Sequence, residues 1–210
     1  MLGMTLLTLP NIKDKILIVG SIYDKTDKIS KIRDMIPNYY ATIFNGNLLY
    51  PFNNPNELKE RIGIINELIE TQKVIYNLGN YDLKLLNILH QNEDHIDIQK
   101  WILSKPNVIA IDFANSSSIL VMSGGLTPDI NSRMKMWDNL ELSFVSQINN
   151  KPWQVYYGGT LGYVISNNPA TPDKPRYFPY AAQIGTRYSK SSTVYAQEID
   201  QFGLKNIIEL

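Results

Sequence analysis

The sequence lacks cysteine entirely and contains only two histidines, His90 and His95, among its 210 residues. Without cysteine the chain can form no disulfide, thiolate nucleophile, cysteine-ligated zinc site or iron–sulfur centre. Any metal would have to be held by carboxylates, amides and at most these two imidazoles. The two histidines are five positions apart, so they would not share one face of a helix. We therefore expect surface or helix-end histidines at both positions.

An excess of charge of one sign is also missing, because 20 Lys and Arg residues balance 20 Asp and Glu residues. A net charge of zero gives no overall attraction to nucleic acid or to an anionic membrane. The basic residues between Lys25 and Arg33 are expected to form a solvated helix face, and no basic stretch interleaves aromatic side chains as a nucleic-acid groove does. We expect neither nucleic acid nor a membrane as a partner.

Long hydrophobic runs are absent as well. No window approaches the roughly 18 uninterrupted apolar residues of a membrane span, and the apolar N-terminus lacks the basic n-region and small-residue cleavage site of a signal peptide. We therefore expect a soluble, intracellular protein of the cytoplasm. The length is typical of a single domain, spanning residues 1–210, with enough sequence for a sizeable core.

What the first half does contain is an alternation of apolar, strand-like runs with amphipathic helical stretches. This pattern is typical of parallel strands joined by crossover helices. Strands are predicted at 15–20, 41–45 and 74–78, and helices at 24–36, 57–70 and, in one or two pieces, 83–103. The three strands lead into Gly20, Gly46 and Gly79. These glycine loops share the carboxyl edge of the predicted sheet, where open α/β sheets build their sites.

The second half is strand-rich, with one predicted helix. Strands are expected at 108–113, 118–122, 153–157, 161–165 and 193–199, and the helix at about 129–148. Four of the 11 prolines fall between Pro169 and Pro179, which predicts an irregular loop over about 167–183. Its aromatic residues Tyr177, Phe178 and Tyr180 are the expected contacts for a partner. Packing over the chain's own core is an equally ordinary role for them.

Five segments that follow predicted strands occur in a recognisable order. They are Gly20-Ser21-Ile22-Tyr23-Asp24, Gly46-Asn47-Leu48-Leu49-Tyr50-Pro51, Gly79-Asn80-Tyr81-Asp82, Ser123-Gly124-Gly125 and Gly158-Gly159-Thr160. This order resembles the GDxHG, GDxxDRG, GNH[DE], HGG and GHT motifs of the calcineurin-like metallophosphoesterases, particularly the serine/threonine protein phosphatases and their phage-type relatives. The resemblance covers Lys15 to about Ile199. It implies an αββα sandwich of two mixed sheets flanked by helices.

The same resemblance places the family's metal ligands on residues that are poor ligands here. In the family, Asp, His and Asn side chains in these five motifs hold two adjacent divalent metals. The matching positions are Ser21, Tyr23, Asn47, Asn80, Ser123 and Gly159, of which Asn80 alone keeps the family's residue. Two neighbouring dications repel strongly and need carboxylates to offset their charge. We therefore expect no metal cofactor, although the family would bind two divalent metals.

The family's remaining catalytic positions are changed too. Tyr81 stands where the family has the histidine that protonates the leaving group, while Asp82 keeps the acidic position that orients it. Tyr50 and Pro51 replace an aspartate and the arginine that grips phosphate. We expect no catalytic residue among these four. Together with Tyr23, the two tyrosines either fill the former site with hydrogen-bonded phenols or offer an aromatic surface to a partner.

These observations predict a catalytically inactive pseudophosphatase that serves as a binding, scaffold or assembly module. One alternative is a phosphoesterase with a rebuilt site, in which Asn80 and either Asp82 or Asp24 hold one metal. A second is a structural subunit of a larger particle or a homo-oligomer. The leading hypothesis predicts a protein partner or a second copy of the chain. The function is a hypothesis in each case, because fold alone does not fix a function.

Overall fold

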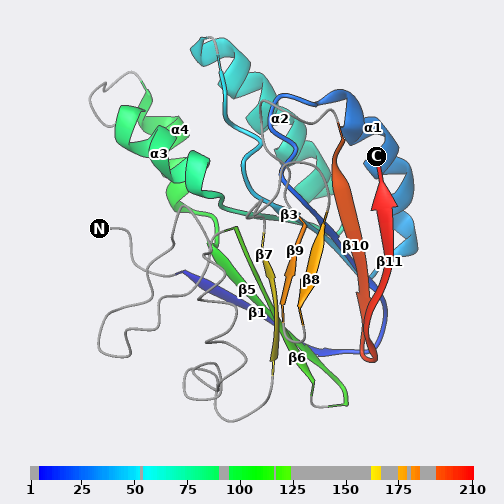
Figure 1. Ribbon diagram of the computed structural model, residues 1–210. Coiled ribbons are helices and arrows are strands. Elements are labelled where there is room, and N and C mark those ends of the chain that lie inside the picture. Colours follow the sequence, from blue (N-terminus) through cyan, green and yellow to red (C-terminus); the bar gives the residue numbers. More distant parts are fainter. Residues whose placement is uncertain are drawn as a thin grey trace.

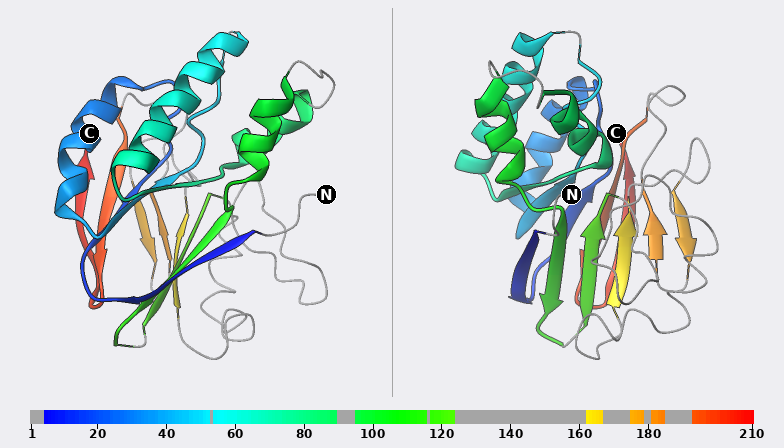
Figure 2. Two further views of the ribbon diagram at one scale, coloured as in Figure 1. Left: turned by 180° about the vertical axis from the view of Figure 1, so that it is seen from behind. Right: turned by 90° about the vertical axis from the view of Figure 1, so that its left-hand side faces the viewer.

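The computed structural model describes residues 5–52, 54–89, 95–115, 117–123, 162–166, 175–178, 181–184 and 193–210. These residues form two mixed β-sheets that pack against each other, with helices on the outer face of one sheet (Figures 1 and 2). The α/β fold class and the two mixed sheets predicted from the sequence are confirmed. The predicted helix at 129–148 and the predicted strand at 153–157 lie outside the described residues.

The five-stranded sheet contains the three parallel strands that were predicted in the first half. Its order is β11-β10-β2-β3-β4, and β2, β3 and β4 run parallel to one another. β10 joins β2 antiparallel, and β11 joins β10 antiparallel. The strands are β2 (Ile16–Val19), β3 (Ala41–Asn45), β4 (Val74–Asn77), β10 (Tyr195–Asp200) and β11 (Gly203–Glu209). The parallel arrangement brings the ends of β2, β3 and β4 to one edge.

The crossover helices are stabilised by apolar faces that are buried against the sheet and, at one helix, by N-terminal capping. The α2 helix begins at Pro55, and the side chain of Asn54 accepts a hydrogen bond from the Glu57 amide at 3.1 Å, which is a typical N-cap. Its buried residues Leu58, Ile62 and Ile65 recur at helical spacing. The helical elements are α1 (Asp27–Met35), η1 (Ile36–Asn38), α2 (Pro55–Thr71), α3 (Asn80–Leu89) and α4 (Ile96–Leu103).

The second sheet has six described strands in the order β1-β5-β6-β7-β9-β8. They are β1 (Leu6–Ile12), β5 (Val108–Phe113), β6 (Ser118–Met122), β7 (Gly162–Ser166), β8 (Arg176–Phe178) and β9 (Ala181–Gln183). The prediction of an irregular loop over 167–183 is wrong in part, because this segment contains the short strands β8 and β9. Tyr177 and Phe178 lie in β8. Three-residue strands bounded by prolines are too short to show a period-2 pattern.

The core is divided into two layers by the alternation of side chains along the strands. Leu17 and Val19 of β2 pack with the helices, whereas Ile16 and Ile18 pack between the sheets. This period of two is the expected geometry of a strand that is buried on both faces. None of the described helices is long and apolar enough to cross a membrane. His95 occupies the N-cap of α4, a helix end as predicted, and His90 lies outside the described residues.

Candidate functional site

The loops that follow β3 and β4 meet at their backbones. Gly46 has a φ angle of +82°, which favours glycine, and a Cβ atom there would clash with the backbone nitrogen and Cα of Gly79. Asn47 and Tyr23 also adopt positive φ angles, of 64° and 55°. The strand ends are therefore held in conformations that L-residues seldom adopt. A rigid arrangement of this kind needs specific contacts to maintain it.

Asn47 connects the three loops through both ends of its amide. Its Nδ2 donates to Ser21 Oγ at 3.1 Å, and its Oδ1 accepts from the backbone nitrogen of Tyr81 at 3.0 Å. A Cβ atom on Gly79 would clash with the Asn47 amide, so this side chain lies directly against the β4 loop. Asn47 is 2 % exposed. The residue at the family's bridging metal position is thus engaged in contacts within the protein.

Asp82 is a fully buried carboxylate in the first turn of α3. Its Oδ2 accepts hydrogen bonds from the amides of Gly79 at 2.8 Å and Asn47 at 3.0 Å, and from the Tyr76 hydroxyl at 2.8 Å. Its Oδ1 lies 3.4 Å from the Leu49 amide. Burial raises the pKa of Asp82 above its usual value, and these hydrogen bonds offset part of that rise. One carboxylate thereby fixes both loops.

Tyr76 of β4 makes a hydrogen bond with the Asp82 carboxylate. It is fully buried, and its hydroxyl donates to Asp82 and accepts from the Leu48 amide at 3.2 Å. Burial and the negative charge of Asp82 raise the pKa of Tyr76 well above its ordinary value. Arg61 of α2 donates to the Leu48 carbonyl at 3.0 Å and is also paired with Glu57. The loop after β3 is therefore held from β4, α2 and α3.

Three tyrosine rings lie next to this network. The rings of Tyr50 and Tyr81 are stacked, with centroids 4.8 Å apart and an interplanar angle of 20°. Tyr23 meets Tyr81 edge to face at 5.9 Å and 75°, a favourable geometry for aromatic pairs. Tyr23 is 3 % exposed, and burial raises its pKa to about 12, while hydrogen bonds with the Ser21 and Asn47 side chains act in the opposite direction. Of the two roles predicted for the tyrosines, space filling describes Tyr23 well.

Two asparagines connect the end of β6 with the ends of β3 and β4. Asn45 donates from Nδ2 to the Met122 carbonyl at 2.9 Å, and Asn77 donates to Asn45 Oδ1 at 2.7 Å. The next residue, Ser123, is buried, and its hydroxyl makes no hydrogen bond with the part of the chain that the structure describes. Asn80 begins α3, while Gly159 lies outside the described residues. Four of the family's ligand positions, those of Ser21, Tyr23, Asn47 and Ser123, are thus placed and buried.

These residues do not fit a dinuclear metal centre. The ligand positions supply hydroxyls and amides without a carboxylate, and the Asn47 amide is already bonded at both ends. Asp24, considered for a one-metal site, is exposed, whereas Asp82 is buried beneath its four donors. No group of three or more His, Cys, Asp or Glu residues that could hold a metal occurs within the described ranges.

The structure joins residues that sequence motifs alone did not connect. Tyr76, Arg61, Asn45 and Asn77 were not anticipated at the site. Their signal in the sequence is a polar side chain at a buried strand or helix position, because such groups need hydrogen-bond partners. Of the predicted partner contacts, Tyr177 is 49 % exposed and donates to Gln197 Oε1 at 2.9 Å, and Tyr180 lies outside the described residues.

Comparison with known proteins gives matches in structure. A scan against protein-family models and a search of curated proteins found none. A protein assigned as a diadenosine tetraphosphatase superposes with a TM-score of 0.64 at 18% identity, over 99% of this chain and 97% of that chain. A Saccharomyces cerevisiae serine/threonine phosphatase similar to human PP5 gives 0.62 at 12% identity, over 99% and 82%.

A third match is the cold-active protein-tyrosine phosphatase of a psychrophilic Shewanella species. It has a TM-score of 0.61 and 12% identity, over 99% of this chain and 83% of that chain. At these identities the likeness is one of fold, and fold does not determine activity. The strand order, the strand-end loops and these three neighbours agree on one architecture. The chain has the fold of the calcineurin-like metallophosphoesterases.

Proposed function

We propose that this protein is a catalytically inactive metallophosphoesterase-fold protein, a pseudophosphatase that serves as a binding, scaffold or assembly module. The observation that supports the proposal most directly is the state of Asn47. At the position where the family has a bridging aspartate, a neutral amide donates to Ser21 and accepts from Tyr81. A dinuclear centre there would have to displace both contacts and would gain no carboxylate to offset its charge.

The position of the family's general acid gives further support. Tyr81 replaces the histidine, and its ring is stacked on Tyr50 and makes a T-shaped contact with the ring of Tyr23. A tyrosine can donate a proton, but protonation of a leaving group completes hydrolysis only after a nucleophile has attacked. The proposal holds that no metal activates a water opposite Tyr81, and without such a nucleophile Tyr81 has no leaving group to protonate.

Metal content and turnover test this proposal together. The full chain is purified, analysed for bound metals and assayed with an aryl phosphate in the presence of Mn²⁺. We expect no stoichiometric divalent metal and no metal-dependent turnover. The rival enzyme, with one metal at a rebuilt site, predicts turnover that Asn80→Ala abolishes. Asn56→Ala, an exposed position in α2, is the matched control for nonspecific effects.

The outcomes separate the two hypotheses clearly. One or two equivalents of bound metal, or turnover lost in Asn80→Ala and retained in Asn56→Ala, would overturn the pseudophosphatase proposal. Turnover that is unaffected by Asn80→Ala would indicate a contaminating phosphatase and would leave the metal analysis to decide between the proposals. An absence of both metal and turnover supports a noncatalytic module.

A further inference from the structure

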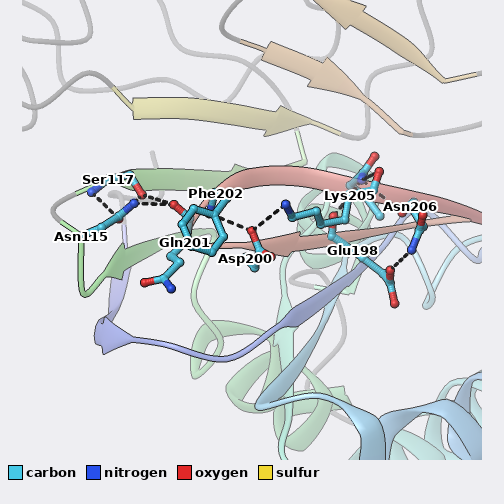
Figure 3. A network of polar contacts seen from close by, with 9 residues as sticks. Asn115, Ser117, Glu198, Asp200, Gln201, Phe202, Lys205 and Asn206 are labelled. Atoms are coloured by element: carbon cyan, nitrogen blue, oxygen red, sulfur yellow. Dashed lines mark hydrogen bonds and ion pairs between the residues drawn. The ribbon is translucent and has the colours of Figure 1, made fainter.

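We draw no further inference here: the strongest candidate, the β11 edge of the five-stranded sheet with the exposed Phe202 at its turn (Figure 3), has nothing in the described residues that shows what covers it.

Discussion

Asp82 carries more of the site's organisation than any other single residue described. It accepts hydrogen bonds from two loops and from Tyr76, all within a fully buried environment. Asp82→Asn replaces one oxygen with an amide group that faces donors. We expect a loss of about 2 to 4 kcal/mol in the free energy of unfolding, because buried donors lose a charged acceptor. Urea denaturation of the full chain measures it.

Asp24→Asn is the matched control, since it makes the same chemical change at an exposed position. It should alter the free energy of unfolding by no more than about 0.5 kcal/mol. Equal effects in the two variants would show that Asp82 does not hold the loops as described.

For single residues, the sequence predicted which residues lie at the candidate site better than it predicted the hydrogen bonds between them. The motif resemblance placed Ser21, Tyr23 and Asn47 at one edge, and the structure places them in one network with Tyr81. It did not predict that Asp82 would bond to the loop after β3. That contact joins positions 35 residues apart, and it depends on the positive φ angles of the loop. A motif records residue types, whereas the direction of an amide is set by the fold.

At the scale of elements, the close approach of the β3 and β4 loops predicts a sharp difference between two glycines. Gly79→Ala would drive a Cβ atom into the Asn47 amide, whereas Gly63 in α2 has no neighbouring atom within 4 Å of an added Cβ. We expect Gly79→Ala to lower the free energy of unfolding by about 1 to 3 kcal/mol. Gly63→Ala should raise it by about 0.5 to 1 kcal/mol.

Thermal melts of the two variants and the parent check these signs. Stabilisation by both substitutions would mean that the two loops are farther apart than described. Destabilisation by both would mean that α2 is crowded at Gly63. Either result would require a different packing of these elements.

The elements themselves were predictable where periodicity was strong. The strands at 41–45, 108–113 and 118–122 were predicted with their observed bounds, and the helical region at 83–103 proved to be two helices. β1 and β11 were missed. Both lie at sheet edges, where the burial pattern is irregular and partner strands, rather than local pattern, stabilise the extended form.

For the whole molecule, one hydrogen bond between distant elements adds a pH-dependent contribution to the free energy of unfolding. Tyr39 is the residue after η1, and its hydroxyl donates to Glu198 of β10 at 2.6 Å. This bond, with a smaller contribution from Asn206, holds the pKa of Glu198 below its usual value. A lowered pKa in the folded state contributes stability above the unfolded-state pKa, and that stability is lost as pH falls through the folded-state value.

Tyr39→Phe should therefore lower the free energy of unfolding by about 1 to 2 kcal/mol at neutral pH. The difference from the parent should shrink in acid, where Glu198 is protonated in both proteins. Tyr40→Phe is the control, because it removes an adjacent hydroxyl from a side chain that is 41 % exposed. Urea titrations across the acid range measure the effect. A difference that stays constant with pH would show that Glu198 is not the acceptor.

The position of β10 in the sheet has a consequence for the order of assembly. β2 is buried along its whole length and lies between β3 and β10, and the register pairs Val19 with Ala196 from the far end of the sequence. During synthesis, one side of this Ile-Leu-Ile-Val strand therefore stays unpaired until β10, which is far later in the sequence, has left the ribosome. Contacts so distant in sequence form slowly, and an unpaired apolar strand is prone to aggregate. The nascent chain thus depends on β10 to cover an apolar strand that was synthesised much earlier.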